Sequence, residues 1–209
     1  MYKFSYFTEE DQDKVLEFIK ATPFAIITGK DNDKDYPVAT HIPLHPTFEN
    51  DKMILTGHMM KNTDHHKTFV NNPQVLVLFN GPHCFVSSSW YTGAMSASTW
   101  NYMTVHAKGK ISFADEARTR EIVEEITNRY EGMDSIRAFK HLPVEYVDKL
   151  VKAIAGFTIA VESMDNVFKL SQNHETETRE SIIKHLEETG DDGSMQIAIE
   201  MKKRISHYL

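Results

Sequence analysis

Short runs of β-branched and aromatic residues, joined by short polar links, constrain the fold of this chain more than any other feature of its sequence. Several links are too short for the crossover that connects parallel strands, so we expect antiparallel pairing. Closure into a barrel would remove the two edge strands that an open sheet leaves exposed. We therefore predict a mainly β (α+β) fold, an antiparallel barrel of six to seven strands with peripheral helices. The predicted strand segments are residues 24–28, 38–44, 52–58, 74–79, 84–88, 100–113 and 154–161, with a short extended piece at 167–170.

Helices are predicted at the ends of the chain and between the strands. Thr8 precedes three acidic residues and an apolar stripe at helical spacing, which predicts a helix over residues 8–21 with Thr8 as its N-cap. Asp115 is expected to cap a second helix, and the glycines at 190 and 193 to separate two C-terminal helices. Two shorter helices are expected at residues 62–71 and after Pro143. We predict one domain over residues 1–174 and a helical appendage over residues 175–209.

Charge and composition exclude several classes of protein. The net charge of −7 disfavours direct binding of nucleic acid, which depends on a surplus of Lys and Arg facing phosphate. Cys84 is the only cysteine, so no intramolecular disulfide can form, and a buried, inert thiol is expected. No apolar stretch is long enough for a signal peptide or a membrane span. We expect a cytoplasmic protein with no membrane contact.

The string Thr56-Gly57-His58-Met59-Met60-Lys61-Asn62 lies where a strand is expected to end and a helix to begin. A helix N-terminus offers unpaired N–H groups, and Lys61 adds a positive charge, so this corner suits a phosphate group. A solvated strand–helix corner is the alternative interpretation.

Both tryptophans of the chain lie close together in sequence, in Ser89-Trp90-Tyr91 and Thr99-Trp100-Asn101-Tyr102. Flat aromatic side chains beside hydroxyls and amides suit stacking against a planar ring. An aromatic corner of the hydrophobic core is the alternative. On a strand, Trp100 and Tyr102 would share one face, and Asn101 would point to the other.

The eleven histidines do not predict a metal centre. His41 and His45 are four residues apart, and on a strand this spacing places them about 13 Å apart, too far to hold one ion unaided. Zinc needs three or four converging ligands, and no HExxH-type pair of helical histidines is present. We predict no metal site.

Several uncommon strings run in order from about residue 23 to residue 186: Pro23-Phe24-Ala25, Ala39-Thr40-His41-Ile42-Pro43-Leu44, Gly57-His58 with Lys61, Asn80-Gly81-Pro82-His83, Ser89-Trp90-Tyr91, Thr99-Trp100-Asn101-Tyr102 with Val105-His106, and Lys169-Leu170-Ser171-Gln172-Asn173. In these strings the chain resembles the PaiB-like FMN-binding negative transcriptional regulators. That family shares the FMN-binding split barrel of pyridoxamine phosphate oxidases and flavin reductases.

The resemblance implies an FMN-binding split barrel and a homodimer, with the flavin in a groove at the dimer interface. Carried over position by position, it assigns Thr56, Gly57, His58 and Lys61 to the phosphate end of the flavin and His41, Ile42, Pro43 and Leu44 to the isoalloxazine edge. It assigns Trp90, Tyr91, Trp100, Asn101, Tyr102 and His106 to the pocket lining, some of them from the partner chain. It assigns no catalytic residue.

Three functions follow as hypotheses. The first is an FMN-binding regulator that acts without direct DNA readout, since the chain shows no helix-turn-helix signature. The second is a flavin-dependent oxidoreductase, and the third is a haem-binding split-barrel protein. Flavin absorbance, a Soret band and NAD(P)H consumption would separate the three.

Overall fold

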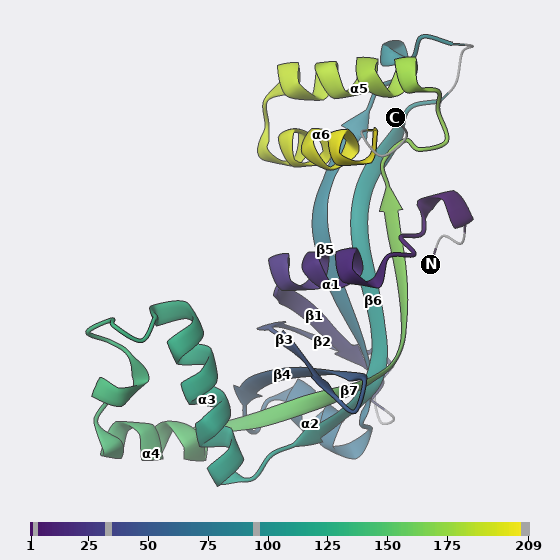
Figure 1. Cartoon of the computed structure of the whole chain (residues 1–209). Helices are drawn as coiled ribbons and strands as arrows, with labels where there is room; N and C mark the ends of the chain where they lie inside the picture. Colours follow the sequence, from purple (N-terminus) through teal and green to yellow (C-terminus); the bar gives the residue numbers. More distant parts are fainter. Residues whose placement is uncertain (2–3, 32–34, 94–96, 206–209) are drawn as a thin grey trace. The chain divides into compact units, whose positions relative to one another are not determined.

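The computed structural model describes residue 1 and residues 4–31, 35–93 and 97–205 (Figure 1). Its strands are β1 (Phe24–Gly29), β2 (Val38–Pro43), β3 (His45–Glu49), β4 (Lys52–Met60), β5 (Gln74–Val86), β6 (Thr99–Phe113) and β7 (Ile154–Lys169). Its α-helices are α1 (Gln12–Ala21), α2 (Asp64–Asn71), α3 (Glu116–Glu131), α4 (Val144–Ala153), α5 (Thr176–Thr189) and α6 (Asp192–Ile205). Short 3-10 helices lie at Ser5–Phe7, Ser88–Trp90 and Phe139–His141.

The strands form one seven-stranded sheet in the order β2-β1-β5-β6-β7-β4-β3. The pairs β1–β2, β1–β5, β3–β4 and β4–β7 are antiparallel. The predicted antiparallel fold of six to seven strands with peripheral helices is therefore confirmed.

Residues of the chain group into two compact units. The first unit comprises residues 1–18, 80–105 and 165–209, and the second comprises residues 19–79 and 106–164. The strands β5, β6 and β7 contribute residues to both. The boundary predicted at residue 174 does not coincide with the edge of either unit, and it stays a prediction.

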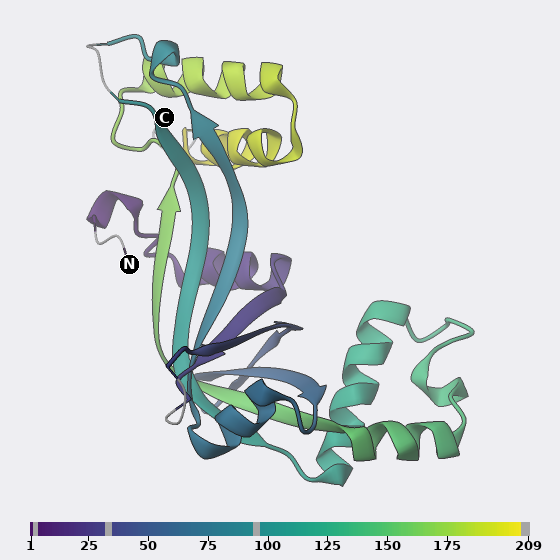
Figure 2. The same ribbon diagram turned by 180° about the vertical axis from the view of Figure 1, so that it is seen from behind.

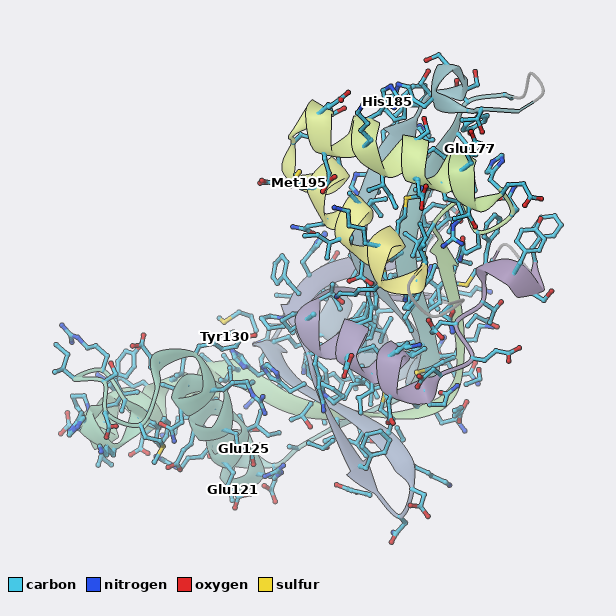
Figure 3. The ribbon with its side chains drawn as sticks, turned by 45° about the horizontal axis from the view of Figure 1, so that its top comes forward. Glu121, Glu125, Tyr130, Glu177, His185 and Met195 are labelled. Carbon is cyan, nitrogen blue, oxygen red and sulfur yellow. The ribbon has the colours of Figure 1, made fainter. Side chains whose placement is uncertain are left out.

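In the second unit, helix α3 lies close against β7. The hydroxyl of Thr119 accepts a hydrogen bond of 3.1 Å from the backbone N–H of Gly156. A Cβ added at Gly156 would lie 3.0 Å from Cα of Thr119, so this approach depends on the missing side chain. The outer side of α3 carries ion pairs from Arg118 to Glu121 and Glu125, both labelled in Figure 3.

In the first unit, α5 and α6 lie side by side (Figures 1 and 2). Ile182 and Leu186 of α5 and Ile197 of α6 are fully buried, so the inner faces of these helices form a core. Gly190 ends α5 with a φ of 73°, a left-handed conformation that glycine adopts without strain. The predicted break between two C-terminal helices is confirmed.

Helix α1 begins later than predicted. Its N-terminal N–H groups are capped by Asp11, whose carboxylate accepts from the backbone N–H of Asp13 at 3.0 Å. Thr8 instead follows the 3-10 helix Ser5–Phe7, and its hydroxyl donates to the carbonyl of Phe4. The prediction that Thr8 is the N-cap is wrong, because the acidic residue next to the helix competes better for this role.

In two places, two consecutive segments that were predicted as separate strands form one long strand. β5 continues through Asn80-Gly81-Pro82, where the sequence predicted a break. Val77 and Phe79 are buried in the first half of β5, and Cys84 is buried in the second half. The buried residues therefore change from odd to even positions along the strand. β1 pairs with β5 from Val75 to Leu78, so this pairing ends before Pro82, which has no N–H to donate to it.

β7 likewise joins the two predicted pieces at 154–161 and 167–170 through a polar stretch of low burial. β3 was not predicted, because its residues Thr47, Phe48 and Glu49 are exposed and lack apolar alternation.

Candidate functional site

The predicted site residues divide between the two units. Trp90, Tyr91, Trp100, Asn101 and Tyr102 belong to the first unit. The remaining predicted residues, His41, Ile42, Pro43, Leu44, Thr56, Gly57, His58, Lys61 and His106, belong to the second.

An exposed aromatic face lies on β5 and β6 in the first unit. Trp100 is 55% exposed, and Phe85 is 49% exposed. The Trp100 ring lies 6.3 Å from Phe85, at 69°, and 6.0 Å from the ring of His83, at 33°. We call Trp100, Phe85 and His83 the aromatic face. The alternative in which Trp100 is a core residue is wrong.

His83 and Phe85 were not among the predicted site residues. Both alternate with the buried Cys84 on β5, so their exposure follows from the period of the strand. This signal was available in the sequence, but the predicted break at residues 80–82 obscured it.

Asn101 points away from the aromatic face and is fully buried. Its amide donates to the hydroxyl of Ser171 at 3.0 Å, and that hydroxyl donates back to Oδ1 of Asn101 at 3.2 Å. The amide also approaches Sδ of Met201 at 3.6 Å. In this arrangement Asn101 supports the turn that follows β7. Tyr102, on the same face of β6 as Trp100, is half-buried.

Trp90 and Tyr91 lie against the segment around α5. The Trp90 ring stacks on His185 at 5.3 Å and 10°, and the hydroxyl of Ser181 donates to the Trp90 carbonyl at 2.7 Å (Figure 3 labels His185). The ring of Tyr91 lies 4.7 Å from His174. Burial raises the pKa of the Tyr91 hydroxyl, so it is a hydrogen-bond donor at neutral pH. These contacts fix the positions of both aromatic residues.

In the second unit, several predicted contacts of the flavin are buried beneath the surface. Ile42, Leu44 and Thr56 are buried. A Cβ at Gly57 would lie 2.9 Å from Cδ2 of Leu44 and 2.9 Å from Cζ of Phe157. The glycine is therefore required by the packing of the core itself.

Lys61 lies at the end of β4 and is half-buried. Its ammonium donates to the carbonyl of Val151 at 3.4 Å, and no carboxylate of the described residues forms an ion pair with it. The N-terminus of α2 is already occupied, because Thr63 accepts from the N–H of His66 and Asp64 accepts from the N–H of His65. Of the two features that suited a phosphate here, the positive charge of Lys61 is the one that remains available.

His58 presents an unpartnered polar atom near this corner. Its ring is half-buried, and the buried Nδ1 has no hydrogen-bond partner among the described residues. Burial lowers the pKa of His58, which keeps the imidazole neutral and able to donate or accept. A buried polar atom without a partner is a candidate contact for a bound ligand.

The other predicted residues of the second unit lie nearer the surface. His41 is exposed and stacks on Phe24 at 5.8 Å and 30°. Pro43 and His106 are half-buried.

Two other kinds of chemistry, metal binding and thiol reactivity, were checked against the described residues. No group of three or more His, Cys, Asp or Glu side chains there could hold a metal ion. The thiol of Cys84 is buried, and burial, with a smaller contribution from Asp191, raises its pKa to about 12. Because the thiolate is the reactive form, the expectation of an inert thiol agrees with its environment.

Comparison with known proteins identifies the relatives of this chain. Residues 1–163 match the model of a family described as "Putative FMN-binding domain". The chain is 30% identical over 206 residues to "Protease synthase and sporulation protein PAI 2" of Bacillus subtilis (strain 168), covering 98% of each chain.

Two solved structures resemble the fold. The flavocytochrome Anf3 from Azotobacter vinelandii matches with a TM-score of 0.60 and 17% identity, over 80% of this chain and 72% of that chain. The FAD and heme binding protein from Mycobacterium smegmatis matches with a TM-score of 0.57 and 14% identity, over 78% of this chain and 73% of that chain. Within the described residues, none of the helices is long and apolar enough to cross a bilayer.

Proposed function

This chain belongs to the FMN-binding domain family, and from that premise we propose that it is an FMN-binding, homodimeric regulator related to PAI 2. The observation that carries the proposal is the aromatic face of Trp100, Phe85 and His83, which is open to solvent in this chain. Flat rings at a protein surface favour stacking with a planar heterocycle.

The isoalloxazine ring is assigned to the surface around Trp100. Trp100 is 55% exposed, so its indole offers an apolar face that a flavin could cover, and the neighbouring rings of Phe85 and His83 would limit access of water. Bound FMN supplies a centre for electron or hydride transfer. Trp90, Tyr91, Asn101 and Tyr102 remain proposed pocket residues, and Asn101 also holds the turn after β7 through Ser171.

The phosphate is assigned to Lys61. Its ammonium forms no ion pair with the described carboxylates, so an anion there would compensate a half-buried charge. His58 has an unpartnered nitrogen that could bond the same ligand. The flavin contacts of His41, Ile42, Pro43, Leu44, Thr56, Gly57 and His106 stay part of this proposal.

We propose that a second copy of the chain covers the part of the aromatic face that the flavin leaves exposed. Exposed aromatic rings on neighbouring strands are unusual in a monomer and are common at interfaces. A C2 dimer would place this face of one copy against the other, with the flavin between them. A single 24.0 kDa species in sedimentation at micromolar concentration would contradict this part of the proposal.

Regulation is favoured over catalysis by the resemblance of the sequence strings to the PaiB-like negative transcriptional regulators, and direct DNA binding is disfavoured by the net charge of −7. The test uses the purified full-length protein. A flavin spectrum with no flavin-dependent NAD(P)H consumption supports the regulator. NAD(P)H turnover would support an oxidoreductase instead, and a Soret band without flavin would support haem binding. If FMN added to the apo-protein gives no saturable change in flavin fluorescence, the proposal fails.

A further inference from the structure

Trp90 is held at its backbone and at its ring by side chains of α5. The hydroxyl of Ser181 donates to the carbonyl of Trp90 at 2.7 Å, and the ring of His185 stacks on the indole at 5.3 Å and 10°. All three residues belong to the first unit. Trp90 is half-buried, so part of it stays accessible to a ligand while His185 covers one side of its ring.

The two residues that follow Trp90 are held by the same segment of the chain. The hydroxyls of Thr92 and Thr178 lie 2.7 Å apart, and the backbone N–H of Thr92 donates to the Thr178 hydroxyl at 3.4 Å. The ring of Tyr91 packs on His174 at 4.7 Å. Residues 90–92 are therefore anchored to residues 174–185 at three consecutive positions.

The anchoring side chains of α5 form one stripe along the helix (Figure 3 labels His185). Thr178, Ser181 and His185 are three and four residues apart, a spacing that brings side chains to the same side of a helix. Ile182 and Leu186 are fully buried. The hydrophobic core of the first unit thus sets the orientation of this stripe.

The imidazole of His185 is itself fixed. Its Nδ1 lies 2.8 Å from the carbonyl of Ser181, and Nδ1 must carry the proton, because a carbonyl oxygen can only accept. This hydrogen bond restricts the rotation of the ring that stacks on Trp90.

Local structure around Trp90 is slight by comparison. The 3-10 helix Ser88–Trp90 is three residues long, and the hydroxyl of Ser87 caps it by accepting from the N–H of Ser89 at 3.3 Å. A single turn of this kind is marginal on its own, so long-range contacts decide where the indole points.

We propose that Ser181 and His185 are positioning residues for the flavin site, which hold Trp90 in the orientation that contacts the isoalloxazine ring. The inference rests on the proposed function. It adds to the site a helix that lies outside residues 1–163, the part of the chain that matches the family model. On this view α5 completes the flavin site and is more than an appendage to it.

The test is titration of FMN and riboflavin into the full-length apo-protein, followed by flavin fluorescence at a temperature where every variant is folded. His185→Ala should weaken both ligands about 3–10-fold, the loss expected for one aromatic stacking contact. Ser181→Ala should weaken both about 2–10-fold, the loss expected for one hydrogen bond. His185→Phe keeps a flat ring and should bind within about twofold of the unmodified protein.

Lys184→Ala is the matched control, because Lys184 precedes His185 on α5 and its side chain is 75% exposed. Its flavin affinity should not change. In the ¹⁵N-labelled apo-protein, the indole N–H resonance of Trp90 should shift in His185→Ala and stay in place in Lys184→Ala.

A double-mutant cycle separates positioning from a general structural role. If His185 acts through the indole, His185→Ala should change FMN affinity by less than about twofold in a Trp90→Ala background. An equal loss of affinity in both backgrounds would overturn the inference. If His185→Ala does not fold, Ser181→Ala enters the same cycle.

Failure of this inference is distinct from failure of the proposed function. If the unmodified protein binds FMN, and His185→Ala and Ser181→Ala bind it equally well, the positioning role is wrong and the proposed function stands. If the unmodified protein binds no FMN, the proposed function fails and the positioning role falls with it.

Discussion

Trp100→Ala separates a ligand-stacking role from a structural role, because the exposed part of the indole contributes little to folding. Trp100 is 55% exposed, so a flavin could cover roughly 100 Å² of its apolar surface. At about 25 cal/mol per Å², that contact is worth about 2.5 kcal/mol, or about 70-fold in affinity.

The cost to the apo-protein should be smaller. Truncation of a fully buried aromatic residue costs about 3–5 kcal/mol, but less than half of the Trp100 surface is removed from water on folding. We expect a loss of about 2 kcal/mol, equivalent to a fall in melting temperature of about 6 °C for a chain of this size.

The assay compares calorimetric melting of the apo-protein with titration of FMN followed by flavin fluorescence. Phe168→Ala is the control in the same unit, since Phe168 is 1% exposed and its loss should lower the melting temperature by about 12 °C. If the apo form of Trp100→Ala melts as low as Phe168→Ala, or if its FMN affinity is unchanged, the assignment of Trp100 to the flavin is wrong.

Three further predictions concern the second unit. Lys61→Ala should weaken FMN about 10–150-fold and leave riboflavin nearly unaffected in parallel titrations, and an equal loss for both ligands would remove the phosphate role. Gly57→Ala should destabilise the apo-protein by about 1–3 kcal/mol in urea unfolding, because its Cβ would lie 2.9 Å from Leu44 and Phe157, and an unchanged midpoint would show that the core yields. Burial lowers the pKa of His58 in the folded chain. As the pH falls below about 6.5, His58 therefore takes up a proton in the unfolded chain but not in the folded chain. Stability should therefore decrease with falling pH in urea unfolding, less so in His58→Gln, and identical slopes would exclude His58 as the cause.

The alternation of apolar and polar residues predicted most of the strands and the opposite orientation of two neighbouring residues of the candidate site. Placing Trp100 and Asn101 on opposite faces of β6 was correct, since one is 55% exposed and the other is fully buried. The same rule failed on β5, because its burial changes phase across Asn80-Gly81-Pro82. A local pattern cannot show that one strand belongs to two units, each of which buries its residues separately.

Long-range partners could not be predicted. The stacking of Trp90 on His185 joins residues 95 positions apart, and the bond between Asn101 and Ser171 spans 70 positions. Neither His185 nor Ser171 carries a local signal of its role, because each contact depends on how α5 and the turn after β7 pack within the first unit. The string that contains Ser171 contributed to the family resemblance, but its function in the fold became evident only from these hydrogen bonds.

The half-buried lysines give the most direct link between the charge of this chain and its proposed ligands. Among the lysines that the structure describes, only Lys14, Lys61 and Lys169 are half-buried, and the rest are exposed. Lys14 pairs with Asp11 at 3.5 Å, whereas Lys61 and Lys169 donate to neutral oxygens. A chain with 30 acidic residues has ample carboxylates to pair with both ammonium groups, yet none of the described ones does so. Since an unpaired cation costs more free energy when it is partly removed from water, the proposed phosphate of FMN would supply the missing counter-charge at Lys61.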